Sequence, residues 1–191
     1  MPSPLKLAHV VLFSAQVKAM RDWYVRVLEA EVVHENDFVA FITYDEEHHR
    51  IAVADRNAAS KSTDGIDKLV QPTSGAATAG DFAPNRGLSH IAFTYGSLKD
   101  LLDNYERLRG DDIVPIFAIN HGTTNSLYYA DPDGNHIELQ VDNFATIQEG
   151  TAFMRSEAFR ANPVGRPIDP DAMLARLHSG EPEAKIIAPW W

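Results

Sequence analysis

The sequence predicts an α+β fold in which a β-α-β-β-β module occurs twice in tandem, followed by a helical C-terminal tail. An internal repeat is the first reason: Leu7-Ala8-His9-Val10 recurs 81 positions later as Leu88-Ser89-His90-Ile91. Further along the chain the offset is 86, and residues 45–52 align with residues 131–138. A fixed offset indicates a duplicated supersecondary unit. The second reason is that strand-like and helix-like hydrophobic patterns follow each other in the same order in both copies.

The first module covers about residues 6–56. Residues 6–13 form a short apolar run rich in β-branched side chains, which predicts a strand. Residues 17–28 carry apolar side chains at helical spacing, which predicts an amphipathic helix. Three further strands are expected at 31–34, 39–44 and 50–54.

The second module covers about residues 88–141 and has the same order of patterns. A strand is expected at 88–95 and a helix at 97–109. Three strands are then expected near 113–118, 126–130 and 135–141. Asp131-Pro132-Asp133-Gly134 separates the last two strands and has proline and glycine where turns favour them.

The rest of the chain has no counterpart in the repeat. Residues 57–87 are rich in Ala, Ser, Thr and Gly, and we expect a linker or lid with a short helical turn at 66–70. The paired modules account for residues 1–145, and residues 146–191 form a C-terminal extension. Helices are expected at 143–159 and 169–177, and Trp190 and Trp191 should pack on the body or on a second subunit.

Composition excludes several classes of function. A formal charge of −10 argues against nucleic acid or an anionic membrane as the partner, and the absence of cysteine excludes a thiol nucleophile or thiolate metal site. The first residues are too few and too polar to begin a signal peptide, and no apolar run approaches ~18 residues. We therefore expect a soluble, cytoplasmic protein, and a homo-oligomer that is a dimer or larger.

The repeat also predicts a metal site. His9 and His90 occupy equivalent positions, whereas Glu138 on the last strand of the second module is replaced in the first module by Ala52. A single strand histidine is usually a packing residue. Two histidines in register with one unmatched carboxylate instead match the facial triad of non-haem Fe(II) proteins, which leaves coordination positions open. We predict that His9, His90 and Glu138 bind one metal ion, Fe(II) or alternatively Mn(II).

These motifs resemble the vicinal oxygen chelate superfamily, which includes glyoxalases, bleomycin resistance proteins and dioxygenases. The most specific segment is residues 120–139, which resembles the type I extradiol ring-cleaving dioxygenases of the 2,3-dihydroxybiphenyl type. The resemblance implies that the modules form one metal-containing half-open barrel. It also implies an enzyme that inserts both atoms of O2 into a catechol-type diol and cleaves the ring. By this resemblance Glu138 is the carboxylate ligand, His49 the acid/base, and Tyr128 and His121 contact the substrate.

Elementary chemistry favours the same roles but leaves alternatives open. A histidine that titrates near neutrality suits the proton transfers of catechol cleavage. Only one of His48 and His49 can face the metal, and the pair could also be an exposed turn. Tyr128 lies ten residues before Glu138, so strand alternation places both on one face unless a bulge intervenes. His136 shares that face and could assist.

Two other functions compete with this hypothesis. Glyoxalase-like isomerases and lyases use four protein ligands, but Ala52 at the fourth position cannot bind a metal. Metal-free binding relatives have no need of both histidines and the glutamate together. The interval from His49 to His90 is also longer than in the well-known two-module dioxygenases, so residues 57–87 are expected to shape the substrate pocket.

Overall fold

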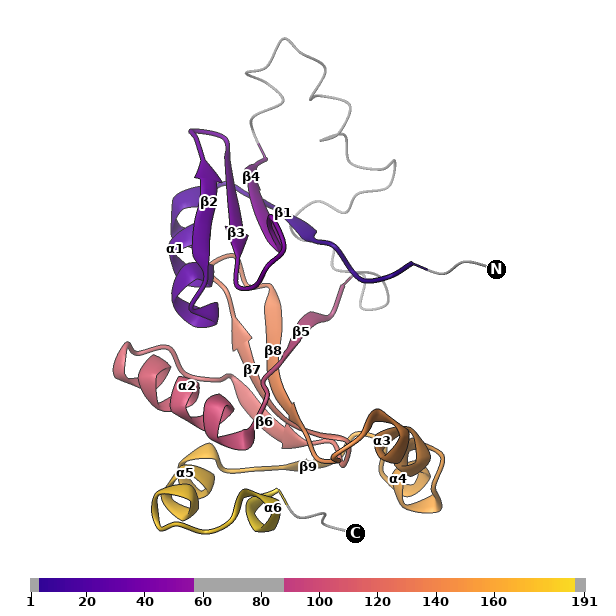
Figure 1. Cartoon of the computed structure of the whole chain (residues 1–191). Helices are drawn as coiled ribbons and strands as arrows, with labels where there is room; N and C mark the ends of the chain where they lie inside the picture. Colours follow the sequence, from indigo (N-terminus) through magenta and orange to yellow (C-terminus); the bar gives the residue numbers. More distant parts are fainter. Residues whose placement is uncertain (1–3, 57–87, 188–191) are drawn as a thin grey trace. The chain divides into compact units, whose positions relative to one another are not determined.

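The computed structural model describes residues 4–56 and 88–187 (Figure 1). The predicted linker, its helical turn at 66–70 and the C-terminal tryptophans lie outside the described residues. The chain forms two compact units. The first comprises Met1–Leu88 with Asp131–Asp133, and the second comprises Ser89–Ala130 with Gly134–Trp191.

The first unit contains the first module as predicted. Its elements are β1 (Val10–Ser14), α1 (Val17–Leu28), β2 (Glu31–Glu35), β3 (Val39–Thr43) and β4 (Ile51–Asp55). The strand order is β1-β4-β3-β2, in which β1 and β4 are parallel and the other pairs antiparallel. Helix α1 packs against β3 and β4 and buries Met20, Tyr24 and Val27. These three residues are spaced at helical periodicity, which explains why one face of the helix is buried.

The second unit repeats this arrangement. Its elements are β5 (His90–Thr94), α2 (Leu98–Gly110), β6 (Phe117–Asn120), β7 (Thr124–Ala130) and β8 (His136–Asp142). The order β5-β8-β7-β6 is that of the first sheet, and β5 is parallel to β8. The Ser97 side chain accepts a hydrogen bond from the Asp100 backbone N–H and so caps α2. The predicted duplication of a β-α-β-β-β module is confirmed.

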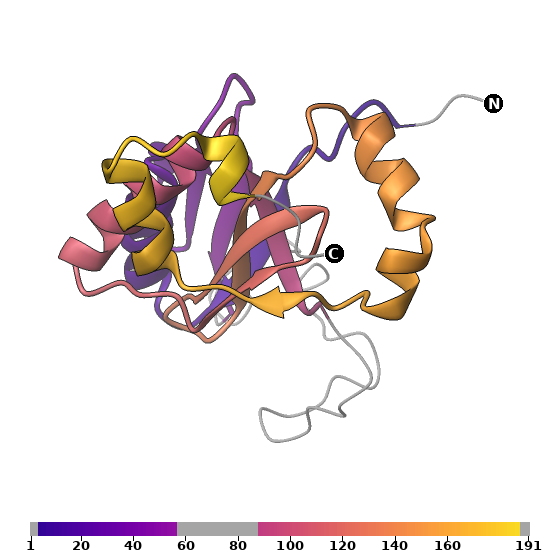
Figure 2. The ribbon, with the colours of Figure 1, turned by 90° about the horizontal axis from the view of Figure 1, so that it is seen from below.

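The C-terminal extension differs in detail from the prediction. It contains α3 (Ile147–Met154), α4 (Glu157–Ala161), β9 (Arg166–Pro167), α5 (Pro170–His178) and α6 (Glu183–Ile186). In Figures 1 and 2, β9 runs between the α3–α4 pair and the α5–α6 pair. The predicted helix at 143–159 was wrong as one element, because α3 ends at Met154 and the Ser156 side chain caps α4 by accepting from the Phe159 N–H.

The second sheet also differs from the prediction at β6 and β9. The strand expected near 113–118 is at Phe117–Asn120, since Pro115 has no N–H to donate to a neighbouring strand. The added strand β9 pairs with β6 through Ile119 and Asn120. It contains only two residues, one of them Pro167, so it has no recognisable pattern. Among the residues that the structure describes, no helix is long and apolar enough to cross a membrane.

Candidate active site

The second unit brings together two of the predicted metal ligands. His90 begins β5, and Glu138 lies on β8 opposite Ala92 of β5. Because side chains alternate along a strand, His90 and Ala92 share a face, and this face also carries Glu138. His90 Nε2 is 3.1 Å from Glu138 Oε2, and Glu138 is 5% exposed. A buried carboxylate needs a partner, and a carboxylate beside an imidazole is a donor pair that fits a divalent cation.

Tyr128 faces the same pair from β7. It is the cross-strand partner of Glu138, and its ring is perpendicular to that of His90 with centroids 5.3 Å apart. Burial, reinforced by the negative charge of Glu138, raises the pKa of Tyr128 well above its usual value. Tyr129 points to the opposite face and is buried in the core. Tyr128 is therefore the tyrosine that lies beside the Glu138 carboxylate.

His121 lies between β6 and β7 and contacts Tyr128. Its Nε2 is 2.9 Å from Tyr128 Oη, and its Nδ1 is 2.5 Å from the backbone oxygen of Val164. On its other side, Tyr128 stacks on Phe117 with ring centroids 4.2 Å apart. The second unit thus places Tyr128 in contact with a histidine, an aromatic ring and a carboxylate.

The first unit brings His9 and His49 together. His9 lies just before β1, and His49 lies in the β3–β4 connection, with ring centroids 4.3 Å apart. Phe41 meets the His49 ring edge-on at 4.8 Å. Burial, helped by electrostatic repulsion from the His9 and His48 rings, lowers the pKa of His49. The lowered pKa favours the neutral form of the His49 ring, which can accept a proton.

His48 and His136 have more open surroundings. His48 Nδ1 is 2.6 Å from His49 Nδ1, but the His48 side chain is 70% exposed. His136 begins β8 and is exposed. The structure thus buries His49 more than either alternative.

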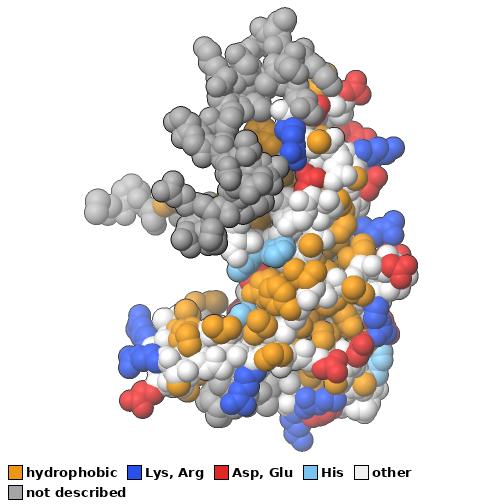
Figure 3. Space-filling view, turned by 180° about the vertical axis from the view of Figure 1, so that it is seen from behind, with side chains coloured by type: hydrophobic (Ala, Val, Ile, Leu, Met, Phe, Trp, Pro, Cys, Tyr) orange, Lys and Arg blue, Asp and Glu red, His pale blue; other side chains and the backbone are white. Residues whose placement is uncertain are grey.

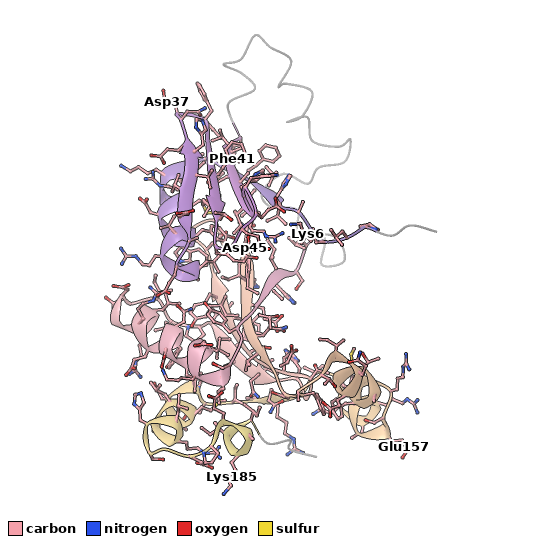
Figure 4. All side chains as sticks on the ribbon, in the orientation of Figure 1. Lys6, Asp37, Phe41, Asp45, Glu157 and Lys185 are labelled. Atoms are coloured by element: carbon pink, nitrogen blue, oxygen red, sulfur yellow. The ribbon has the colours of Figure 1, made fainter. Side chains whose placement is uncertain are left out.

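An apolar row crosses the first sheet on the face opposite α1. Val11, Ala52 and Phe41 are register partners on β1, β4 and β3, and Phe41 is labelled in Figure 4. Ala52 is 2% exposed, so its methyl group is enclosed by neighbours. Figure 3 shows histidine side chains at the surface next to hydrophobic ones. Such a face suits an aromatic ligand.

Arg50 holds the segment that carries His9, a role that sequence reasoning missed. Its guanidinium donates to the backbone oxygens of Leu7 and Ala8 at 2.6 and 3.0 Å. Asp45, labelled with Lys6 in Figure 4, binds Arg50, and this hydrogen bond holds the pKa of Asp45 below its usual value. The sequence shows only an acidic turn here, because the acceptors on residues 7 and 8 are backbone atoms.

Within residues 4–56 and 88–187, no three His, Cys, Asp or Glu side chains lie close enough together to hold a metal ion. The structure groups the predicted residues as His9 with His49 in the first unit. In the second it groups His90, Glu138, Tyr128 and His121.

The chain is an α+β protein built from two β-α-β-β-β modules, each with a histidine at its start. One buried glutamate lies beside the second of these histidines, and together they could bind a metal ion. The chain belongs to the glyoxalase/bleomycin resistance protein/dioxygenase superfamily, whose family model matches residues 6–139. The predicted membership is confirmed.

Two curated relatives cover nearly the whole chain. Biphenyl-2,3-diol 1,2-dioxygenase 2 of Rhodococcus globerulus is 43% identical over 186 residues, which cover 97% of this chain and 88% of the relative. Biphenyl-2,3-diol 1,2-dioxygenase 3 of the same organism is 41% identical over 191 residues, which cover 97% and 89%.

Solved structures of low identity share the fold. The lactoylglutathione lyase of Agrobacterium tumefaciens has a TM-score of 0.54 at 16% identity and covers 73% of this chain and 96% of its own. A glyoxalase/bleomycin resistance protein/dioxygenase from Nocardioides has a TM-score of 0.52 at 18% identity, with coverage of 74% and 86%.

Proposed function

We propose that this chain is an extradiol ring-cleaving dioxygenase that inserts both atoms of O2 into a catechol-type aromatic diol. The observation that carries the proposal is the buried Glu138 carboxylate, which is flanked by His90 and Tyr128 on neighbouring strands. The dioxygenases at 43% and 41% identity act on a diol of this class by their names.

His9, His90 and Glu138 would hold the metal, with Fe(II) as the first choice and Mn(II) as the alternative. Two neutral imidazoles and one carboxylate leave a divalent ion with a net positive charge and open positions, which suits a catecholate. When bound, the metal supplies a Lewis acid for the two diol oxygens and a centre that reacts with O2. Ala52, the counterpart of Glu138 in the first module, has no ligating atom and adds no fourth ligand.

His49 is the proposed proton acceptor. Its lowered pKa keeps the imidazole neutral, so that it can take a proton from a diol hydroxyl and later return it. His48 is the proposed neighbour that helps to hold the His49 ring, since their Nδ1 atoms are 2.6 Å apart. Tyr128 and His121 are proposed to hydrogen-bond the diol oxygens.

The proposed substrate is a catechol that carries an aryl substituent. Val11, which is 49% exposed, and the half-buried Phe41 offer apolar surface on either side of the buried Ala52, and the Phe41 ring packs against His49. Burying an aryl ring on such a surface is favourable in proportion to the apolar area removed from water. The relatives' names specify a biphenyl diol.

Oxygen uptake is the direct test. The protein is loaded anaerobically with Fe(II) or Mn(II) and mixed with 2,3-dihydroxybiphenyl or unsubstituted catechol. We expect one O2 consumed per diol, no hydrogen peroxide, a conjugated product that absorbs visible light, and preference for the biphenyl diol. Product formation that needs no O2 would instead favour the glyoxalase-like alternative.

A pair of variants links this activity to the site. Glu138→Gln removes a buried charge and should abolish both metal retention and O2 uptake. Glu157→Gln removes an exposed carboxylate on α4, labelled in Figure 4, and should leave both unchanged. A Glu138→Gln protein with normal iron content and activity would contradict the proposal.

We also propose a cytoplasmic homo-oligomer. Large hydrophobic side chains such as Leu7, Val114 and Ile147 are 72%, 56% and 72% exposed, and burial against another subunit would remove them from water. Light scattering of the purified protein tests the oligomeric state, and a monomer at all concentrations would contradict it.

A further inference from the structure

The C-terminal extension places a backbone carbonyl against a side chain of the site. His121 Nδ1 is 2.5 Å from Val164 O. A carbonyl oxygen can only accept a hydrogen bond, so Nδ1 must carry the proton. In the neutral ring the other nitrogen, Nε2, is then an acceptor. It is this nitrogen that lies 2.9 Å from Tyr128 Oη.

A glycine allows the carbonyl to come this close. Gly165 has φ +98°, a left-handed conformation that other residues rarely adopt. A Cβ atom there would lie 2.1 Å from Asn120 O and 2.7 Å from His121 Cα. No other residue can therefore follow Val164 without displacing the backbone.

The surrounding hydrogen bonds hold both partners in place. Asn162 donates from Nδ2 to Gly165 O and accepts from the Gly165 N–H, each at 2.9 Å. On the other side, Asn143 donates from Nδ2 to Gly122 O at 2.9 Å and to Asn120 Oδ1 at 3.0 Å. The His121 turn is therefore fixed on one side by Asn143, which directly follows β8, and on the other side by the extension.

The position of the proton on His121 decides what Tyr128 can do. Tyr128 has one O–H hydrogen and two acceptors beside it, the Glu138 carboxylate and a neutral His121 Nε2. With both groups as acceptors, no neighbour donates to the Tyr128 oxygen. The Tyr128 oxygen is then free to accept from a hydroxyl of an incoming diol. With the proton on Nε2 instead, His121 would donate to Tyr128 and lose its bond to Val164.

We propose that Val164 and Gly165 are positioning residues that fix the Nδ1–H tautomer of His121 and thereby make its Nε2 an acceptor, not a donor, toward Tyr128. The consequence for catalysis rests on the proposed dioxygenase function, whereas the tautomer itself does not. Residues of the C-terminal extension would in this way orient the two side chains, His121 and Tyr128, that are proposed to contact the substrate.

Nitrogen-15 NMR of histidine-labelled, metal-free, full-length protein tests the tautomer directly. The spectrum is recorded at about pH 8, where histidines are mostly neutral, and the His121 signals are identified by their absence in His121→Gln. We expect protonated Nδ1 and unprotonated Nε2 in the wild type. An Nε2–H tautomer for His121 would overturn the proposal whatever the enzyme activity.

Two glycine variants separate the close contact from backbone strain. Gly165→Ala should abolish the Nδ1–H signature and lower kcat/KM by up to about 10²-fold, the cost of an ångström-scale misplacement. Gly180→Ala is the matched control, because Gly180 has φ +83° but no atom within 4 Å of the added Cβ. It should keep the wild-type tautomer and activity.

A substitution at Asn162 tests the same contact if Gly165→Ala does not fold. Asn162→Ala removes both bonds to Gly165 without adding atoms, and should populate the Nε2–H tautomer. An unchanged His121 spectrum in a folded Asn162→Ala or Gly165→Ala protein would refute the positioning role. If wild type shows the Nδ1–H tautomer but cleaves no catechol, the proposed function fails while the tautomer assignment stands.

Discussion

Two buried tyrosines provide a sharp test of the energetics around the β7–β8 turn. Tyr24 of α1 is fully buried, and its hydroxyl donates to Asp131 Oδ2 at 3.0 Å. Tyr129 of β7 is 1% exposed, but its hydroxyl has no hydrogen-bond partner among the described residues. Phenylalanine replaces either side chain with almost the same shape, so only the hydroxyl changes.

The two substitutions should have opposite consequences for stability. A hydrogen bond to a charged group contributes about 1.5–3 kcal/mol, and Asp131 is 5% exposed, so Tyr24→Phe should lower the free energy of unfolding by that amount. For a domain of this size the melting temperature should fall by roughly 3–12 °C. Tyr129→Phe removes an unpaired buried hydroxyl and should be neutral or stabilise by up to about 1 kcal/mol.

Urea unfolding followed by circular dichroism measures both variants against the wild type. Asp131 directly follows the strand of Tyr128 and begins the turn that leads to β8 and Glu138, so Tyr24→Phe should also reduce dioxygenase activity. Equal destabilisation by the two substitutions would refute the reasoning, because it would mean that the Asp131 contact contributes nothing beyond side-chain packing.

Four further predictions concern the site and the buried core beneath it. His9→Ala should remove stoichiometric iron from the protein, measured by metal analysis, while the circular dichroism spectrum stays native. Ala52→Glu should add a fourth ligand and weaken catechol binding, and a normal turnover rate would show that residue 52 lies away from the metal. His49→Gln should slow single-turnover O2 consumption by ~10²–10⁴-fold, whereas the exposed His48→Gln should have a smaller effect. Because burial raises the pKa of Tyr129 above that of an unfolded tyrosine, stability should be lost as the pH rises above about 10, and Tyr129→Phe should lose less in alkaline unfolding curves.

Several contacts of the site could be predicted from residue spacing along neighbouring strands. Tyr128 and Glu138 are cross-strand partners because a short turn with proline and glycine joins their strands. Strand alternation then places His90 on the same face as Glu138. Each of these relations depends on residue types at short spacing, which is why the fold and these groupings could be predicted.

The C-terminal extension was harder to predict. Its first helix breaks at residues 155–156, where a serine cap competes with continued helix. Strand β9 contains only two residues, and its partner β6 begins later than its apolar pattern suggested because of Pro115. Short elements of this kind depend on tertiary pairing more than on local propensity.

The sequence by itself determined the duplicated modules, the pairing of His90 with Glu138 and the membership of the family. Only the tertiary structure showed that Arg50 holds the backbone before His9. It also showed that the backbone oxygen of Val164 contacts His121, although the two residues are 43 positions apart in the sequence. Every residue has a carbonyl, so an acceptor of this kind has no signature in the sequence. Its role depends on where the folded chain places it.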